Sequence, residues 1–268
     1  MRIGFVGAGR MGAPMVRRLS TAGHEVHVLA HDPEKRAALT ESRVSATLQL
    51  SEIGTDADAV VVCVFTDEQV RAVCLDGDLP AAMPPGSALV VHTTTRPHTM
   101  TAVAERAAQY GVDVLDAPVS GGPHDIAAGT LTIFLGGTDT AVRRVRSMLS
   151  CYADPILHVG PLGSGQQVKL LNNAAFAAQL GMVVEIVRLA DRFGLDEAMV
   201  LRALPHGSAG GRALAGAAAR GSVGEFVTAV HGFLAKDVAE VRSAMAESGG
   251  DLGTLEPLID ALEHPVTG

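Results

Sequence analysis

The chain begins with the stretch Ile3-Gly4-Phe5-Val6-Gly7-Ala8-Gly9-Arg10-Met11-Gly12, in which an apolar run meets three glycines spaced G-x-G-x-x-G. An amphipathic segment follows, and a strand that runs through such a turn into a helix is the context that dinucleotide binding requires. Gly7 permits a tight turn, Gly9 lets the backbone approach a pyrophosphate, and Gly12 lets helix and strand pack closely. The stretch therefore predicts a βα unit whose helix N-terminus faces a dinucleotide phosphate.

The length of the chain indicates how many domains it forms, and its net charge indicates which kinds of partner it binds. With 268 residues the chain is long enough for two domains, because single hydrophobic cores stop growing at about this size. A net charge of −8 without a basic block argues against nucleic acid or an anionic membrane as the main partner. A small molecule is the expected partner.

Cysteine usage and the N-terminal segment indicate a compartment. Cys63, Cys74 and Cys151 lie far apart and lack the spacing of a disulfide framework or a zinc site. The N-terminal segment lacks the features of a signal peptide, and no uninterrupted apolar run reaches the ~18 residues that span a bilayer. We therefore expect a cytoplasmic protein without a metal site.

From residue 1 to about residue 160, short apolar segments alternate with helical patterns, which predicts a doubly wound α/β sheet. The segment Val60-Val61-Val62-Cys63-Val64 is apolar without a break, as expected for a central parallel strand that is covered on both faces. The expected strands are 2–6, 25–30, 58–64, 87–92, 112–116, 131–136 and 155–159. The expected helices between them are 12–22, 34–40, 67–74, 98–109 and 139–149.

The character of the sequence changes after Pro161-Leu162-Gly163-Ser164-Gly165, where residues 166–193 form one long helical pattern rich in Ala, Leu and Val. Apolar residues on nearly every face predict a helix that is buried all round, within one chain or between subunits. Helical patterns continue at 196–204, 210–219, 226–247 and 254–262. We therefore predict a dinucleotide-binding domain over 1–162 and an all-α domain over 163–268.

A second notable segment, Asp116-Ala117-Pro118-Val119-Ser120-Gly121-Gly122, directly follows an expected strand. Ser120 supplies a hydroxyl, and Gly121 and Gly122 supply unobstructed backbone N–H groups, a set that can hold a carboxylate. Ser and Gly are also common in ordinary turns, so this segment alone leaves a binding site and a plain turn both open.

The long helical pattern starts with Gly163-Ser-Gly165-Gln-Gln-Val-Lys169-Leu-Leu-Asn172-Asn173. Lys169 and Asn173 are four residues apart, so both project from one helical face and can share a ligand. Adjacent asparagines are unfavourable in an apolar helix, and a polar substrate would satisfy their amides. A desolvated lysine beside a nicotinamide cation would have a lowered pKa and could exchange a proton with a substrate hydroxyl. The alternative is a lysine that snorkels from the helix edge.

A fourth candidate is the pair Lys236-Asp237, which lies inside the expected helix 226–247. Charged pairs on helices are usually solvated, so their spacing alone does not assign them to a site.

Taken together, these segments resemble the β-hydroxyacid dehydrogenase family, which includes 3-hydroxyisobutyrate dehydrogenase and 6-phosphogluconate dehydrogenase. The glycine turn, the Asp116–Gly122 segment, the Gly163–Asn173 segment and Lys236-Asp237 match the family's motifs in order over nearly the whole chain. The resemblance implies a Rossmann-type doubly wound sheet joined by the long helix to an all-α domain, which makes the contacts of a homodimer or homotetramer. It also implies an NAD(P)-dependent oxidoreductase that transfers hydride between nicotinamide and a small 3-hydroxy acid or its semialdehyde.

The resemblance assigns roles to individual residues. Lys169 is the implied catalytic acid/base, and the implied substrate contacts, which hold a carboxylate and a hydroxyl, are Ser120, Gly121, Gly122 and Asn173. The implied cofactor contacts are Gly7, Gly9, Arg10, Met11, Gly12, His31, Asp32, Thr94, Lys236 and Asp237.

The choice between NAD and NADP stays open in the sequence. NADP-using relatives usually carry Asn-Arg-Ser/Thr at the positions of Ala30, His31 and Asp32, and NAD-using relatives often carry an acid at the first of these. Asp32 could accept from a ribose 2′-OH and would repel a 2′-phosphate. His31 and neighbouring basic residues could partly offset that repulsion.

Two alternative functions use the same fold. An imine reductase usually replaces the family lysine, so the presence of Lys169 favours hydroxyacid chemistry. A dinucleotide-binding sensor without catalysis would keep the glycine turn but has no reason to keep Ser120, Lys169 and Asn173 together.

Overall fold

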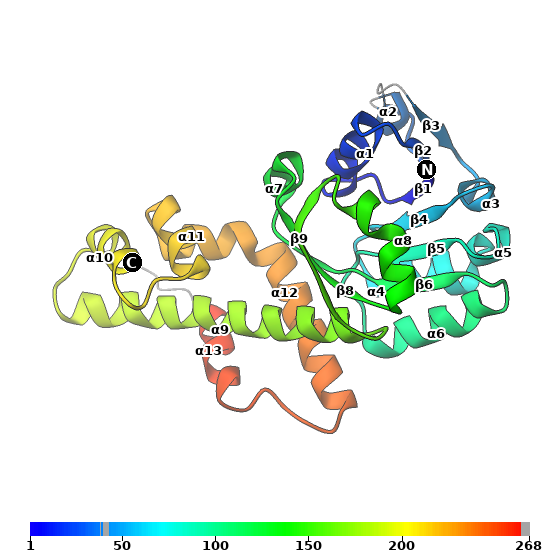
Figure 1. Ribbon diagram of the computed structural model, residues 1–268. Helices are drawn as coiled ribbons and strands as arrows, with labels where there is room; N and C mark the ends of the chain where they lie inside the picture. Colours follow the sequence, from blue (N-terminus) through cyan, green and yellow to red (C-terminus); the bar gives the residue numbers. More distant parts are fainter. Residues whose placement is uncertain (38, 40–42, 264–268) are drawn as a thin grey trace. The chain divides into compact units, whose positions relative to one another are not determined.

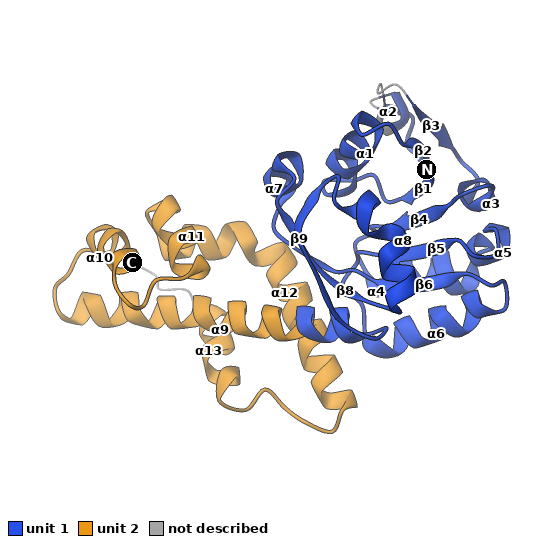
Figure 2. Cartoon of the chain, viewed as in Figure 1, with its two compact units in different colours: residues 1–169 blue, residues 170–268 orange. Residues whose placement is uncertain are grey.

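The computed structural model describes residues 1–37, 39 and 43–263. The chain divides into two compact units, unit 1 over Met1–Lys169 and unit 2 over Leu170–Gly268 (Figure 2). The division falls inside one continuous helix, α9 (Ser164–Arg192), which starts in unit 1 and continues in unit 2.

Unit 1 contains a sheet that is nine-stranded in the described part of the chain, with helices on both faces (Figure 1). The strand order is β3-β2-β1-β4-β5-β6-β8-β7, and β9 pairs with β8. β1 to β6 run parallel, whereas β8 runs antiparallel to β6 and β7. The strands are β1 (Arg2–Val6), β2 (Glu25–Leu29), β3 (Val44–Thr47), β4 (Ala59–Val62), β5 (Ala88–Val91), β6 (Asp113–Asp116), β7 (Val119–Ser120), β8 (Leu131–Gly136) and β9 (Ala153–Gly160).

Two hydrophobic cores cover the two faces of this sheet. Val61 of β4 packs in one core with α1, α7 and α8, while Val60 and Val62 pack in the other with α3, α4, α5 and α6. The predicted two-sided burial of this central strand is therefore confirmed. The helices are α1 (Gly12–Thr21), α2 (Pro33–Ala37), α3 (Leu50–Gly54), α4 (Asp67–Arg71), α5 (Leu79–Ala82), α6 (Pro97–Ala108), α7 (Pro123–Ala128) and α8 (Asp139–Leu149), and a short π-helix, Ala72–Asp76, extends α4.

Unit 2 is built of helices around its part of α9. One apolar cluster joins α9 to α10, α11, α12 and α13. These helices are α10 (Glu197–Ala203), α11 (Arg212–Arg220), α12 (Val223–Glu247) and α13 (Glu256–Asp260). The predicted fold class, a doubly wound sheet followed by an all-α unit, is confirmed.

Within a single chain the long helix is not buried on every face, and its burial between subunits stays a prediction. Met182, Leu189 and Phe193 are 40%, 48% and 79% exposed, so one side of α9 and its C-terminal end stay open in a single chain. Among the described residues, α9 is the one helix with the length and mean hydropathy, 1.4, of a membrane span. Because 56% of its most apolar window is buried inside the protein, it has the character of a core helix.

Several short elements were not predicted. The edge strand β3 has the sequence Val-Ser-Ala-Thr, which has no apolar run, and α3, α5 and α7 have six residues or fewer. The helix expected at 34–40 is seen as α2, Pro33–Ala37, while residues 38 and 40 lie outside the described residues. Such short elements depend on their neighbours more than on their own periodicity.

Candidate functional site

The residues that the sequence singles out in unit 1 lie at one edge of the sheet. The glycine turn follows β1, His31-Asp32 follows β2, Thr94 follows β5, and Ser120 lies just beyond β6. These strands are neighbours in the order β2-β1-β4-β5-β6 and run parallel, so their carboxyl ends share an edge. The strand order reverses between β1 and β4, which is where ligands bind in open α/β sheets.

Two of the three glycines in the turn are required by packing. Gly7 has φ +98°, and a Cβ there would lie 2.3 Å from the Cys63 carbonyl oxygen. A Cβ on Gly12 would lie 2.2 Å from the Gly7 carbonyl oxygen and 2.8 Å from the Phe5 ring. No larger side chain fits at either position without a backbone shift.

Gly9 differs from its two neighbours. A Cβ on Gly9 would meet no atom within 4 Å among the described residues, so space is open in front of this part of the turn. The helix α1 begins directly afterwards, and within the described chain its first turn carries no acidic side chain. An open approach beside an uncompensated helix N-terminus fits the pyrophosphate of a dinucleotide.

At the end of β2, His31 and Asp32 are both exposed, and Ala30 is buried. The Asp32 carboxylate accepts a hydrogen bond from the backbone N–H of Glu34 at 2.9 Å, at the start of α2. Asp32 therefore caps this short helix in addition to lying where a ribose hydroxyl is expected.

The Ser-Gly-Gly segment forms a constrained turn. Ser120 is half-buried in β7 opposite Thr132. Gly121 has φ +131°, and a Cβ there would lie 2.7 Å from the Asp125 carboxylate. The N–H of Gly122 donates to the same carboxylate at 2.6 Å, so this expected anion donor already has an internal acceptor.

Lys169 is half-buried in the second turn of α9, and the first turn is held by Asp116, the fully buried last residue of β6. The Asp116 carboxylate accepts from the N–H of Gly163 and from the N–H of Gln166, each at 2.7 Å. Burial raises the pKa of the Asp116 carboxyl, and these N–H groups oppose that rise. Asp116 belongs to the predicted Asp116–Gly122 segment, but the sequence alone does not indicate this role.

Gln166, also missed, is fully buried and joins α9 to the segment after β5. Its Oε1 accepts from the N–H of Thr95 at 3.0 Å, and its Nε2 donates to the carbonyl oxygen of Thr93 at 2.9 Å. Thr94, an expected cofactor contact, is buried between these two residues. The helix that carries Lys169 is thus hydrogen-bonded to two strand ends.

Asn173, one turn beyond Lys169 on α9, is 5% exposed. Its Oδ1 accepts from Asn172 at 3.3 Å, whereas its buried Nδ2 has no hydrogen-bond partner in the described part of the chain. A buried amide donor without an acceptor is costly, and a ligand oxygen would satisfy it.

Lys236 and Asp237 lie in α12 of unit 2. Their side chains are 21% and 15% exposed and approach to 3.3 Å. The general expectation that such a pair is solvated is wrong here, because both side chains are largely covered.

A buried polar pair formed by His92 and Tyr152 was also missed. His92, after β5, contacts the Ala117 carbonyl oxygen through Nδ1 at 2.6 Å and the Tyr152 hydroxyl through Nε2 at 2.8 Å. Because a carbonyl only accepts, Nδ1 carries the proton and Nε2 accepts from Tyr152. Burial lowers the pKa of His92 to about 4, so the ring is neutral at pH 7.

This histidine predicts a pH dependence of stability. Between pH 6.5 and about 4 the unfolded chain binds a proton at His92 that the folded chain excludes, so stability falls as pH falls through this window. The full loss is about 3 kcal/mol. Urea unfolding of the wild type and of His92→Asn at pH 7 and pH 4.5 measures it, with a smaller pH dependence expected in the variant. Equal dependence in both proteins would contradict the assignment.

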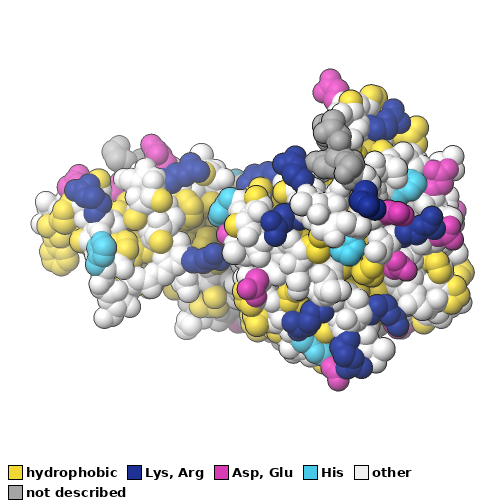
Figure 3. Space-filling model, turned by 45° about the horizontal axis from the view of Figure 1, so that its top comes forward, with side chains coloured by type: hydrophobic (Ala, Val, Ile, Leu, Met, Phe, Trp, Pro, Cys, Tyr) yellow, Lys and Arg dark blue, Asp and Glu magenta, His cyan; other side chains and the backbone are white. Residues whose placement is uncertain are grey.

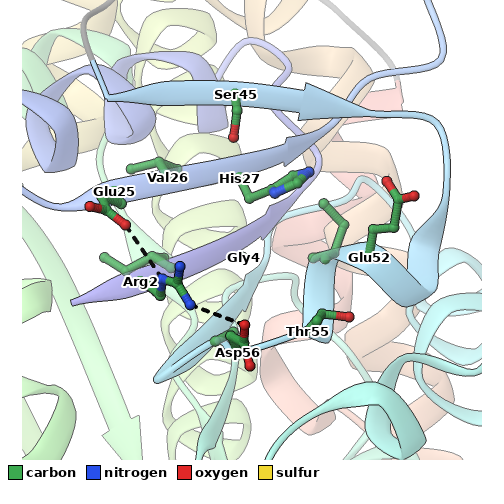
Figure 4. A pocket seen from close by; sticks show the side chains of 12 residues that line it. Arg2, Gly4, Glu25, Val26, His27, Ser45, Glu52, Thr55 and Asp56 are labelled. Carbon is green, nitrogen blue, oxygen red and sulfur yellow. Dashed lines mark hydrogen bonds and ion pairs between the residues drawn. The ribbon is translucent and has the colours of Figure 1, made fainter.

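A surface pocket of about 370 Å³ lies away from this edge (Figure 4). It is lined by the amino-terminal parts of β1 and β2, by β3 and by α3, with Arg2 paired to Glu25 and Asp56 at its mouth. Within the described chain, none of the sequence-predicted site residues line it. Over the same described ranges, no group of three His, Cys, Asp or Glu side chains is placed to hold a metal ion.

Comparison with known proteins places the chain in a family. Residues 2–160 match the model described as the NAD binding domain of 6-phosphogluconate dehydrogenase. Residues 163–256 match the model described as NAD-binding of NADP-dependent 3-hydroxyisobutyrate dehydrogenase.

Individual relatives agree with these matches. The chain is 33% identical to 3-hydroxyisobutyrate dehydrogenase of Pseudomonas aeruginosa, over 79% of this chain and 72% of that protein. It is also 33% identical to an uncharacterized oxidoreductase of Mycobacterium tuberculosis, over 73% of this chain, and spans 66% of that protein's length. The solved structure of Mycobacterium tuberculosis 3-hydroxyisobutyrate dehydrogenase with L-serine superimposes with a TM-score of 0.85 at 28% identity, covering 98% of this chain and 92% of that one. The chain therefore belongs to the β-hydroxyacid dehydrogenase family.

Proposed function

We propose that the protein is an NAD(P)-dependent oxidoreductase that interconverts a small 3-hydroxy acid and its semialdehyde, with Lys169 as the acid/base. The observation that carries the proposal is the attachment of the Lys169 helix to Asp116, at 2.7 Å to two backbone N–H groups. Asp116 lies four residues before Ser120. The end of β6 therefore leads into the proposed carboxylate-binding turn and also holds the helix that carries the proposed acid/base. A dehydrogenase needs these two groups to be held together.

Each residue has a definite task in this proposal. Lys169 takes the proton of the substrate hydroxyl during oxidation and returns it during reduction. The Ser120 hydroxyl and the Gly121 N–H hold the substrate carboxylate, while Gly122 keeps the turn closed through Asp125. The buried Nδ2 of Asn173 donates to a substrate oxygen and thereby gains its missing partner.

The dinucleotide supplies the hydride acceptor or donor when it is bound. The glycine turn, Arg10 and Met11 are proposed to hold its pyrophosphate at the start of α1, where Gly9 leaves open space. His31 and Asp32 are proposed to meet the ribose, and Thr94, Lys236 and Asp237 are further proposed cofactor contacts. The cofactor is NAD or NADP.

The test is a substrate panel followed at the absorbance band of reduced nicotinamide. Oxidation of 3-hydroxyisobutyrate and of L-serine, and reduction of succinic semialdehyde and glyoxylate, are measured with each cofactor. We expect turnover of at least one 3-hydroxy acid. Dinucleotide binding without turnover of any member of the panel would reject the proposal in favour of a sensor.

We also propose a cytoplasmic homodimer or homotetramer, as the resemblance implies. Charged side chains of both signs are interspersed over unit 1, whereas apolar side chains gather at the end of unit 2 where α9 leads into α10 (Figure 3). Met182 and Leu189 fall on one side of α9 at a spacing of seven residues, Phe193 follows directly after the helix, and all three are exposed. Exposed apolar stripes of this kind mark association surfaces. Light scattering after gel filtration measures the mass, and a monomer would contradict the proposal.

A further inference from the structure

The start of α9 is fastened by two buried side chains that the proposed chemistry does not use. Asp116 binds the N–H groups of Gly163 and Gln166 at 2.7 Å, and the Gln166 amide binds the backbone of Thr93 and Thr95 at 3.0 Å or less. These contacts join residues that are 47 to 73 positions apart in the chain. All of them lie within unit 1, which ends at Lys169.

The backbones of Gly136 and Gly165 pass close to the Asp116 carboxylate. A Cβ on Gly136 would lie 2.2 Å from Asp116 Oδ1, and a Cβ on Gly165 would lie 2.8 Å from Oδ2 and 2.5 Å from the Phe134 carbonyl oxygen. Two glycines thus let β8 and α9 close directly on this side chain. The carboxylate position is therefore fixed on both sides as well as by its hydrogen bonds.

The hydrogen bonds of the attachment favour an ionised Asp116 and oppose the rise in its pKa that burial causes. Its oxygens accept from N–H groups at the N-terminus of a 29-residue helix, where the helix dipole favours negative charge. An amide at this position would present an NH₂ group to one of the two N–H donors, because only one of its heavy atoms accepts hydrogen bonds. Replacement by asparagine therefore breaks one attachment while it keeps the side-chain size.

Lys169 receives the effect of this attachment through the helix itself. Gln166 and Lys169 are three residues apart, on adjacent positions of one helical surface. The backbone hydrogen bonds between successive turns keep their spacing, so a displacement of the first turn of α9 also moves the second turn. A misplacement of about 1 Å is enough to cost roughly 10²-fold in rate.

We propose that Asp116 and Gln166 are positioning residues, which set the place of the Lys169 ammonium by fixing the first turn of α9 on the ends of β5 and β6. This inference rests on the proposed function, in which Lys169 is the acid/base. It predicts that weakening the attachment lowers proton transfer while dinucleotide binding persists.

The first test compares Asp116→Asn with the wild type, with 3-hydroxyisobutyrate as the probe, well below the melting temperature of both proteins. We expect kcat to fall about 10- to 100-fold and the dissociation constant of the reduced dinucleotide to change less than about threefold. The matched control is Thr138→Ala, which removes the side-chain cap of α8. It is expected to lower the melting temperature and leave kcat unchanged. A normal kcat in Asp116→Asn would overturn the inference.

The second test is a double-mutant cycle with Lys169→Ala. If Asp116 acts through Lys169, Asp116→Asn lowers the residual rate of Lys169→Ala less than about twofold. Independent, multiplying losses in the two variants would overturn the positioning role and leave the proposed function standing. Near-normal turnover in Lys169→Ala alone would instead reject the proposed function, so the two failures are distinguishable.

The third test needs no turnover. Amide hydrogen exchange in Asp116→Asn and in Gln166→Met, which keeps the side-chain length without hydrogen bonds, is expected to speed up selectively at residues 163–169. Unchanged exchange in this segment, or an increase spread evenly over unit 1, would overturn the inference. Gln166→Met also serves if Asp116→Asn does not fold.

Discussion

Lys169→Ala is expected to lower turnover about 10²- to 10⁴-fold, which is the scale of general acid–base catalysis. The variant loses the proposed acceptor of the hydroxyl proton, but the glycine turn at the end of β1 is untouched. Dinucleotide affinity is therefore expected to stay close to that of the wild type. Turnover is followed by nicotinamide absorbance and affinity by fluorescence of the reduced dinucleotide.

Two further variants separate proton transfer from charge and from helix damage. Lys169→Arg keeps a positive charge but cannot release a proton, so it is expected to be nearly as slow as the alanine variant. Gln167→Ala changes an exposed residue of α9 two positions before Lys169 and is expected to retain full activity. Near-normal turnover in Lys169→Ala would refute the acid/base assignment, and loss of activity in Gln167→Ala would show that the helix, not the lysine, is sensitive.

Gly7→Ala is expected to destabilise the protein by about 2–4 kcal/mol, since a positive-φ backbone and an overpacked contact each cost one or more kcal/mol. The new methyl group would lie 2.3 Å from the Cys63 carbonyl oxygen, and that oxygen belongs to the backbone and cannot rotate away. The turn would have to separate from the end of β4, which belongs to the central part of the sheet. Urea unfolding gives the change in the free energy of unfolding.

Gly9→Ala is the matched comparison in the same turn. Its methyl group would enter open space, so stability is expected to change by less than about 1 kcal/mol. Dinucleotide affinity is expected to fall, because the methyl group would occupy the proposed approach of the pyrophosphate. Normal dinucleotide affinity in Gly9→Ala, or wild-type stability in Gly7→Ala, would contradict the roles given to these two glycines.

The parts of the fold that the sequence predicts are those with long or repeated local signals. The apolar run before Gly7, the unbroken valines of β4 and the long pattern of α9 each cover enough residues for periodicity to decide between strand and helix. β3 has four residues of mixed polarity. It is a strand because it pairs with β2 at the edge of the sheet. Its strand character is a tertiary effect that local sequence does not carry.

The candidate site divides in the same way. Lys169 and Asn173 were singled out because their spacing on one helix is a local property. The contacts of Gln166 with Thr93 and Thr95 join distant parts of the chain, and no local pattern encodes which amide meets which strand end. Asp116 is a charged residue at the end of a buried strand. This is the one sequence signal that could have indicated a buried contact of its carboxylate.

Asp32 is a proposed ribose contact and also caps α2, which has a consequence for altering the coenzyme preference by design. Its carboxylate supports the first turn of α2 through the Glu34 N–H, so exchange for alanine would remove both a negative charge and a helix support. Serine or asparagine would discharge the site for a 2′-phosphate while keeping an oxygen for that N–H. A design that aims at NADP should therefore start from serine or asparagine at position 32. The helix cap is then kept, and a gain in affinity for the 2′-phosphate is not offset by loss of order at the start of α2.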